Sequence, residues 1–346
     1  MAGRTLSEQA LNRALLARQM LLERRRLRPV EAVERLGGLQ TQYAPSGYIG
    51  LWSRLEGFGR ADLTRALVRR AIVQGTVMRA TIHMVSAADY PLLVAGVRAA
   101  RREWWLRATR RRIEPATVAA AAARARELLA DGPLRRSELV RRLGVTSDLW
   151  NGIGLWVDLL RAPPSGTWDQ RRADLYVAAA DWLDLAEPEP QAGIEHLVRR
   201  YLGGFGPASV RDITSWAGLP PAVVEPVAAR VAPRRFRDEA GGELVDLARA
   251  PLPDPATPAP VRFLGTWDAM LLVHARRTGV LPGRFRPILF STQTPQSVPT
   301  FLVDGRVAGS WKHEDGRIVT TPFEPLPAGA ARELAAEAER LAALMA

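Results

Sequence analysis

The segment from residue 76 to residue 85 has the clearest alternation of apolar and polar positions in the chain. Its apolar positions are Met78, Ala80, Ile82 and Met84. The intervening positions include three polar side chains, those of Arg79, Thr81 and His83. Because successive side chains of a strand point to opposite faces, the pattern predicts one strand from Thr76 to Val85 whose apolar face lies in the core. The polar face is then directed either to solvent, as on a wing, or to a cleft.

Helical periodicity marks a second class of segments. Helices are predicted at 62–70, 88–106, 116–130 and 330–345. The segment 98–112 carries a dense basic cluster in which Trp104 and Trp105 are embedded. Basic and aromatic side chains together could bind a phosphate backbone and stack on unpaired bases. Tryptophans on a connecting helix more often pack between domains, so both interpretations stay open at this point.

Two segments in the middle of the chain repeat one order of residues. Each begins with Gly-Pro, at Gly132 and at Gly206, and continues with a short helix that ends at Gly144 or Gly218. Second helices are predicted at 149–160 and 221–231, and short strands after turn-rich segments at 173–178 and 243–247. Helix, glycine turn, helix and hairpin are the outline of a winged helix. A third, less regular copy is expected near the N-terminus.

The C-terminal region has a different pattern. The five prolines between residues 251 and 260 predict a linker. Beyond it, Asp-Gly pairs at 304–305 and 315–316 separate apolar runs, which predicts a three-stranded meander before the final helix. Arg306, Trp311 and Lys312 are expected to be exposed on this meander, where they could approach DNA as a β-ribbon does or simply be solvated.

These elements predict a mainly α-helical fold with small β wings, an α+β fold with three tandem winged-helix motifs plus a C-terminal β-hairpin or meander region. An N-terminal winged-helix module is expected at residues 1–90. Connecting helices and a second winged helix are expected at 91–190, and a third winged helix at 191–250. The C-terminal meander and helix take residues 261–346.

Composition adds a class of partner. The chain of 346 residues has a net charge of +12 and a pI near 11.1, which favours a polyanionic partner, with nucleic acid as the default. Almost all of this charge is arginine, because the only lysine is Lys312. Arginine binds phosphate through a planar fork and stacks on bases, so it suits such a partner.

Composition also excludes several kinds of chemistry. The absence of cysteine excludes disulfides, thiolate nucleophiles and cysteine zinc sites. The four histidines lack metal-ligand spacing, so neither a metal nor a cofactor is expected. No signal peptide and no apolar run of membrane-spanning length are found, which predicts a cytoplasmic protein without a membrane partner.

Gln40-Thr41-Gln42 follows a helix that Gly37-Gly38 is expected to end. If this segment is extended, its two amide side chains point to the same side and form a neutral pair that could hold water. On local chemistry alone, a solvated loop is the more ordinary interpretation. A resemblance to one protein family, carried by segments along nearly the whole chain, reverses this preference.

The chain resembles the AlkZ/YcaQ-like family of bacterial DNA glycosylases, winged-helix proteins that excise alkylated purines. The segments that carry the resemblance are 39–42, 78–85 and 300–311. The family motif is Gln, any residue, then Gln or Asp, and Gln40 and Gln42 fall on its two functional positions. Relatives with two glutamines resemble self-resistance enzymes of producers of DNA-alkylating natural products, whereas those with Asp are more similar to general repair enzymes. Thr41 departs from the family, which often has an aliphatic residue there.

The resemblance implies a monofunctional DNA glycosylase that hydrolyses the N-glycosidic bond of N7-alkylguanine and N3-alkyladenine, including bulky adducts or interstrand crosslinks. Gln40 and Gln42 are then the catalytic residues. The expected partner is double-stranded DNA that contains alkylated purines, without an obligatory protein partner. The residues expected to contact DNA are Arg79, Thr81, His83, Arg306, Trp311 and Lys312.

A transcription regulator that binds DNA without changing it is the alternative, because winged helices most often serve this purpose. A regulator would protect a defined operator, whereas a glycosylase would leave abasic sites. The residues alone do not decide between the two.

Overall fold

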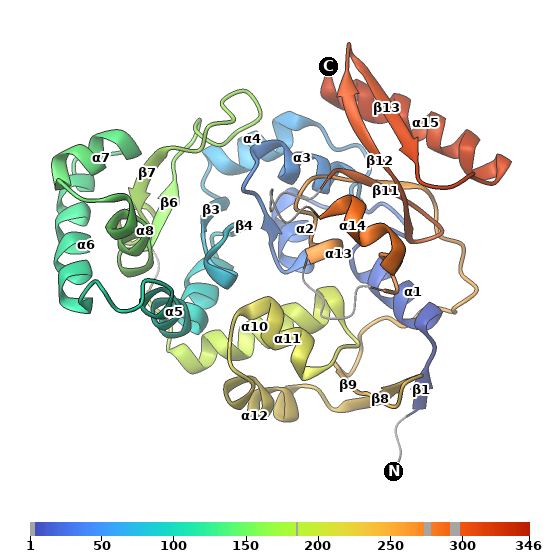
Figure 1. Ribbon diagram of the computed structural model, residues 1–346, viewed down its shortest axis with the longest axis horizontal. Helices are drawn as coiled ribbons and strands as arrows, with labels where there is room; N and C mark the ends of the chain where they lie inside the picture. The colour runs from blue at the N-terminus through green and yellow to red at the C-terminus, as the bar shows by residue number, and fades with distance from the viewer. Residues whose placement is uncertain (1–3, 185, 273–277, 291–297) are drawn as a thin grey trace.

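One order of elements occurs three times along the chain: a helix, a short strand or bridge, two further helices and a two-stranded wing (Figure 1). The computed structural model describes residues 4–184, 186–272, 278–290 and 298–346. In each copy the short strand or bridge pairs with the second strand of the wing. This is the organisation of a winged helix. The predicted fold class, mixed α and β with three winged-helix motifs and a C-terminal sheet, is confirmed.

The first winged helix carries the Gln-Thr-Gln segment. Its elements are α2 (Pro29–Leu36), β2 (Leu39–Gln40), α3 (Ala44–Trp52), α4 (Arg60–Val68), β3 (Ile72–Thr76) and β4 (Ile82–Ser86). Its strands lie in the order β2-β4-β3. The helix predicted at 62–70 corresponds to α4.

The single strand predicted for residues 76–85 is wrong. The segment contains the end of β3, a tight turn that includes the one-turn helix η1 (Met78–Ala80), and most of β4. The register pairs residue 76 with 82 and residue 75 with 83, so positions of equal parity stay on one face across the turn. Alternation therefore continues through the hairpin as it would along one strand. The face expected to be polar is buried at Val77, His83 and Val85.

The second winged helix extends the same sheet. Its elements are α6 (Pro115–Leu129), β5 (Leu134–Arg135), α7 (Arg136–Leu143), α8 (Ser147–Trp156), β6 (Leu159–Arg161) and β7 (Leu175–Ala178). The helix predicted at 149–160 ends at Trp156, and its last residues belong to β6. β6 pairs with β3, which joins both wings into one six-stranded sheet of order β2-β4-β3-β6-β7-β5. The loop between β6 and β7 extends toward α3 and α4 (Figure 1).

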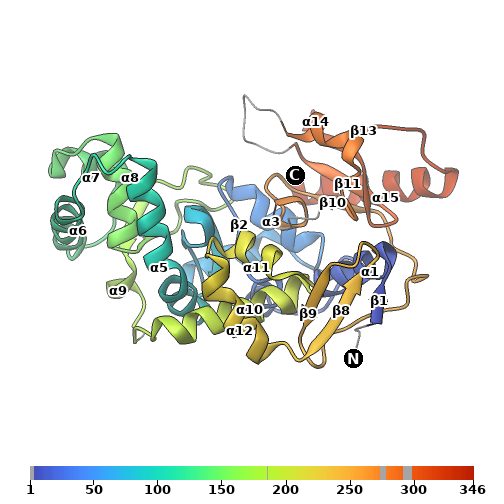
Figure 2. The same ribbon diagram turned by 60° about the horizontal axis from the view of Figure 1, so that its bottom comes forward.

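The third winged helix comprises α10 (Pro190–Phe205), a bridge between Ala208 and Val245, α11 (Val210–Ala217), α12 (Pro221–Val231), β8 (Arg234–Asp238) and β9 (Glu243–Asp246). The helix predicted at 221–231 has the same bounds as α12. β1 (Arg4–Leu6) lies beside β8 as a parallel strand (Figure 2). α1 (Glu8–Arg18) follows it directly.

Helices α5 (Asp89–Ala108) and α9 (Ala179–Trp182) complete the connections between the winged helices. Trp105 of α5 is buried and meets Trp156 edge to face at 5.7 Å, so the packing interpretation holds for this tryptophan. Trp104 remains exposed. One hydrophobic cluster includes residues of α1, β4, α5, α10 and the C-terminal region. The winged helices therefore share a core. None of the described helices combines the length and the apolar composition that crossing a membrane requires.

The C-terminal region contains a four-stranded sheet of order β10-β11-β12-β13. Its elements are β10 (Arg262–Leu264), α13 (Ala269–Leu272), η2 (Gly283–Phe285), α14 (Arg286–Leu289), β11 (Thr300–Val303), β12 (Arg306–Glu314), β13 (Arg317–Pro322) and α15 (Ala328–Met345). The three predicted strands are confirmed, and β10 adds a fourth that the sequence pattern did not indicate. The predicted linker at 251–260 contains neither helix nor strand.

A fully buried ion pair ties α1 to the third winged helix. Arg18 donates to both carboxylate oxygens of Asp246 at 2.8 and 2.9 Å, and to the carbonyl oxygen of Leu202 at 2.8 Å. Both charged side chains have no exposed surface. A buried guanidinium that loses its carboxylate cannot recover the solvation that it gave up on folding.

We expect Asp246→Ala to lower the free energy of unfolding by about 3–5 kcal/mol, because it leaves Arg18 buried without a counter-charge. Urea denaturation followed by circular dichroism measures the change. Glu56→Ala, which removes an exposed pair with Arg26, is the matched control and should have little effect. Equal losses for the two variants would contradict the assignment.

Candidate active site

The Gln-Thr-Gln segment lies against β4, the second strand of the six-stranded sheet. Gly37 ends α2 in a left-handed conformation. At Gly38, which has a φ of 88°, a Cβ atom would lie 2.9 Å from the side chain of Val85. Glycine is therefore required for the close approach that lets β2 pair with β4. The register places Gln40 opposite His83, and Thr41 N donates to the carbonyl oxygen of Ile82 at 2.9 Å.

The two amides meet at the end of β2. Gln40 is buried, with 8% of its surface exposed, whereas Gln42 is exposed. Gln40 Nε2 donates to Gln42 Oε1 at 3.3 Å. Thr41 points away into the core, where its Oγ1 has no hydrogen-bond partner among the described residues. Because the hydroxyl makes no hydrogen bond there, an aliphatic side chain would fit this position equally well.

Arg79 contacts the amide pair. Its Nη2 donates to Gln40 Oε1 at 3.0 Å, and its Nη1 donates to the carbonyl oxygen of Trp216 at 2.6 Å. Trp216 belongs to α11, so this arginine joins the first winged helix to the third. Arg79 was predicted to contact DNA. In the structure, its Nη1 and Nη2 groups instead donate hydrogen bonds to atoms of the protein.

His83 and Thr81 were expected to face DNA, and the exposure expected for His83 is wrong. Only 2% of His83 is exposed, and its strand β4 lies between β2 and β3. Its Nδ1 lies 3.0 Å from the carbonyl oxygen of Thr81, and Thr81 Oγ1 donates to the carbonyl oxygen of Met78 at 3.1 Å. Burial, reinforced by the charge of Arg79, lowers the pKa of His83 to about 3. The imidazole is therefore neutral at physiological pH.

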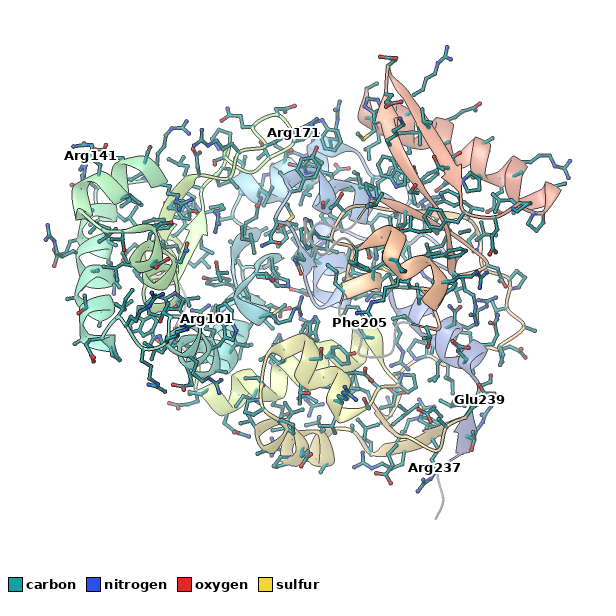
Figure 3. The ribbon with its side chains drawn as sticks, viewed as in Figure 1. Arg101, Arg141, Arg171, Phe205, Arg237 and Glu239 are labelled. Carbon is teal, nitrogen blue, oxygen red and sulfur yellow. The ribbon has the colours of Figure 1, made fainter. Side chains whose placement is uncertain are left out.

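Two residues beside the motif were missed by the sequence analysis. Tyr43 follows Gln42 directly and is exposed, and Arg171 Nη1 donates to its hydroxyl at 3.2 Å. Arg171 lies on the loop between β6 and β7 (Figure 3). Trp168 on the same loop packs against Tyr48 of α3 at 5.5 Å. The available signal was the Arg171-Arg172 pair in the turn-rich segment before β7.

The C-terminal residues predicted to contact DNA differ in their surroundings. Trp311 was expected to be exposed, but only 5% of it is, and its Nε1 donates to the carbonyl oxygen of Leu264 at 3.0 Å. The unpredicted strand β10 covers it. Arg306 is half-buried and pairs with Glu8 of α1 at 3.5 Å. Lys312 is exposed near the second hairpin turn, 2.6 Å from Glu314. Among the described residues, no hydrogen bond or ion pair joins these three to the amides.

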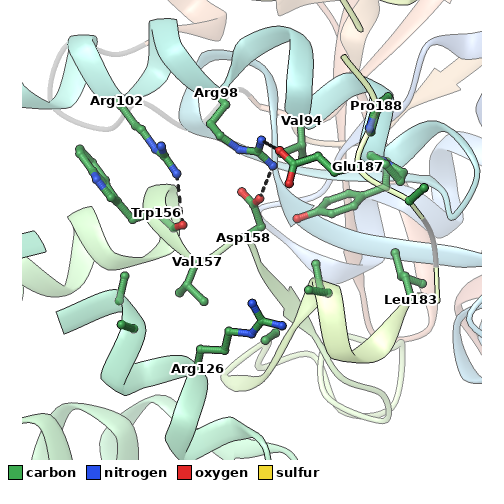
Figure 4. A pocket seen from close by; sticks show the side chains of 18 of the residues that line it. Val94, Arg98, Arg102, Arg126, Trp156, Val157, Asp158, Leu183, Glu187 and Pro188 are labelled. Carbon is green, nitrogen blue, oxygen red and sulfur yellow. Dashed lines mark hydrogen bonds and ion pairs between the residues drawn. The ribbon is translucent and has the colours of Figure 1, made fainter. Parts of the chain in front are cut away.

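A cavity of about 560 Å³ lies away from the amide pair, between α5, α6 and the segment that follows α8 (Figure 4). Its wall includes Arg98, which pairs with Asp158 at 2.8 Å and with Glu187. Arg102 donates to the carbonyl oxygen of Leu155 at 3.0 Å. None of the residues predicted for catalysis or DNA contact lines it. Within the described ranges, which exclude His274, no three acidic or histidine side chains could hold a metal ion.

Comparisons with known proteins agree on one family. A family model described as "DNA glycosylase AlkZ-like" matches residues 33–344. A curated protein of Streptomyces sahachiroi, "Interstrand DNA cross-link repair glycosylase", is 26% identical over 359 aligned residues that cover 93% of each chain. The solved structure of Streptomyces sahachiroi DNA glycosylase AlkZ has a TM-score of 0.83 at 22% identity, with 98% of this chain and 97% of that chain covered. That likeness shows a shared fold.

We expect His83 to make folding pH-dependent. Because its folded pKa of about 3 lies below its ordinary value of 6.5, the unfolded chain binds a proton that the folded protein does not. This contribution to stability is complete above about pH 6.5 and is lost progressively as the pH falls toward 3. The slope approaches about 1.4 kcal/mol per pH unit. Urea denaturation at pH 4–7 should show a slope shallower by one proton in His83→Gln, and equal slopes would contradict the burial argument.

Proposed function

The chain belongs to the AlkZ-like DNA glycosylase family, and we propose that this DNA glycosylase hydrolyses the N-glycosidic bond of cationic alkylated purines in double-stranded DNA. N7-alkylguanine and N3-alkyladenine are the simplest such lesions. The observation that carries the proposal is the pair of neutral amides, Gln40 and Gln42, within the segment that the family model matches. That match does not favour a regulator without catalytic activity.

A cationic base changes what the enzyme must supply. A purine alkylated at N7 or N3 carries a positive charge, so its bond to the sugar is weakened and the base leaves without protonation. What remains is to hold a water molecule near C1′ and to stabilise the positive charge that develops on the sugar. Oriented amide dipoles can do both, because their oxygens accept hydrogen bonds and carry partial negative charge. A catalytic carboxylate is then dispensable.

The different exposure of the two amides supports a division of roles. Gln42 Oε1 accepts one hydrogen bond from Gln40 and retains a second lone pair. This lone pair and Gln42 Nε2 remain available for the sugar or the water. Gln42 is the exposed member of the pair and is assigned direct contact with water. Gln40 holds Gln42 in place and contributes its dipole.

Exposed basic residues are assigned to the DNA backbone. Arg171 with Tyr43 lies next to the motif, and Lys312 lies near the exposed second hairpin turn of the C-terminal sheet. Such contacts replace counterions around the phosphates, so they contribute affinity without sequence preference. Arg306 is a weaker candidate because it is half-buried; both Arg306 and Lys312 also pair with a carboxylate, that of Glu8 at 3.5 Å and that of Glu314 at 2.6 Å. The burial of Trp311 and His83 removes both from this set.

The Streptomyces relative is named for repair of interstrand crosslinks. We extend this substrate class to the present chain and propose that bulky adducts and crosslinks of DNA-alkylating natural products are accepted, in repair or self-resistance. Two glutamines in the motif support this assignment, because the resemblance associates that variant with self-resistance enzymes. The protein would act on chromosomal DNA in the cytoplasm, without an obligatory protein partner.

We expect Gln40→Ala and Gln42→Ala each to lower the single-turnover excision rate of N7-methylguanine by about 10- to 1000-fold, because each removes one positioned dipole near the sugar. The assay cleaves abasic sites with alkali and separates the strands on a gel. Gln191→Ala, at an exposed glutamine in the first turn of α10, is the matched control. A double variant that excises at nearly the wild-type rate would exclude these amides from the mechanism.

We also expect the enzyme to depend on a leaving group that is already cationic. In duplexes that differ only in the lesion, N7-methylguanine and N3-methyladenine should be released, whereas uracil, 8-oxoguanine and guanine should not. The reason is that a neutral base leaves as an anion unless it is protonated, and two amides supply neither the proton nor a positive charge that would stabilise the anion. Efficient release of uracil beside N7-methylguanine would mean that the enzyme protonates the leaving base or stabilises its anion, and that the proposed mechanism is wrong.

A further inference from the structure

We infer that Arg79 is a positioning residue, which holds Gln40 in the one amide orientation that supports Gln42 and makes this orientation depend on the third winged helix. The inference rests on the proposed function and departs from the expectation that Arg79 contacts DNA. Two features of the site carry it: the direction of the hydrogen bonds between the guanidinium and the amides, and the anchor of the guanidinium on the third winged helix.

The first feature is the direction of the hydrogen bonds. A guanidinium only donates, so the Gln40 atom that faces it at 3.0 Å has to be the oxygen. Gln40 Nε2 is then turned toward Gln42 and can meet only the oxygen of that side chain, at 3.3 Å. One donor therefore determines the orientation of both amides. Without it, Gln40 could flip by half a turn and present its oxygen to the oxygen of Gln42.

The second feature is the anchor on the third winged helix. Arg79 Nη1 donates to the carbonyl oxygen of Trp216 at 2.6 Å, near the C-terminal end of α11. The next turn brings Gly218, with a φ of 73°, against the backbone of Arg79. A Cβ atom on Gly218 would lie 3.4 Å from Arg79 N and Cα. The turn after α11 is thus packed directly on the arginine that holds Gln40.

The backbone of the turn sets the position of Arg79. Arg79 and Ala80 both have positive φ values, 51° and 56°, although neither is glycine. Left-handed conformations are uncommon for such residues, but a two-residue hairpin turn of type I′ requires positive φ at both of its central positions. The turn between β3 and β4 therefore sets the direction in which Arg79 leaves the wing, and from this position the guanidinium reaches Gln40 and Trp216 together.

The test compares Arg79→Met, which removes every donor, with Arg79→Lys, which retains a donor-only group. We expect Arg79→Met to lower the single-turnover rate of N7-methylguanine excision by about 100-fold, the effect of misplacing a catalytic group. Arg79→Lys should recover most of the rate. In a Gln40→Ala background, Arg79→Met should change the rate by less than about twofold, because the residue acts through Gln40.

Binding separates this role from a phosphate contact. The dependence of the affinity for undamaged duplex on salt should be the same for Arg79→Met and the wild type. Arg171→Met, at a proposed phosphate contact, should reduce the logarithmic slope by about one. Arg199→Met removes an exposed arginine that pairs with Glu195, and it should leave both rate and slope unchanged. A reduced slope for Arg79→Met, together with an undiminished rate effect in the Gln40→Ala background, would assign Arg79 to DNA and overturn the inference.

A spectroscopic measurement is independent of activity. The side-chain amide resonances of Gln40, assigned by comparison with Gln40→Ala, should shift and broaden in Arg79→Met and remain near their wild-type positions in Arg79→Lys. If they do not respond to Arg79→Met, the inference is wrong even if the rate falls. If the wild type excises no alkylated base but the Gln40 resonances still shift in Arg79→Met and not in Arg79→Lys, the proposed function fails and the positioning role stands. If Arg79→Met does not fold, Arg79→Gln replaces it, because an amide can donate or accept and so cannot fix the orientation of Gln40.

Discussion

The pairing of β2 with β4 is the constraint on which the candidate site depends. β2 has only two residues, Leu39 and Gln40, and both are paired with β4, the strand next to it in the sheet. This short ladder directs Gln40 to the same face as His83, and it releases Gln42 at the surface one residue after Thr41. A slip of one residue would exchange the buried and exposed side chains, so the hydrophobic contacts of Leu39 also determine where the amides lie.

From this pairing the site extends to elements that are distant in sequence. β4 continues into the turn that carries Arg79, β3 pairs with the second winged helix through β6, and Arg79 binds the third winged helix at Trp216. The first and third winged helices therefore meet at the amide pair through Arg79, and the second winged helix belongs to the same sheet. The described cavity between α5 and α6 is not part of this arrangement.

The sequence predicted the features that depend on local interactions. The bounds of α12 and the hairpin turn at Asp315-Gly316 follow from helix and turn preferences of neighbouring residues. It failed where burial is decided by distant elements. The pattern at 76–85 could not reveal its turn, because parity is kept across it, and Trp311 is buried by β10, which lies some fifty residues earlier. Gln40 and Gln42 were found through resemblance, whereas the role inferred for Arg79 needed the contact with α11.

Only part of the net charge of +12 is exposed and available to bind DNA. Several arginines are bound to carboxylates inside the protein: Arg18 to Asp246, Arg54 to Asp268, and Arg98 and Arg101 to Asp158. These charges are compensated where they lie and attract little from outside. Arginine in this chain therefore serves two purposes, joining the winged helices through buried forks and, at exposed positions such as Arg171, offering charge to phosphate. The planar set of donors that makes arginine suitable for binding DNA also makes it suitable for holding the glutamine pair in place. The residue type does not distinguish these two uses, whereas burial and hydrogen-bond partners do.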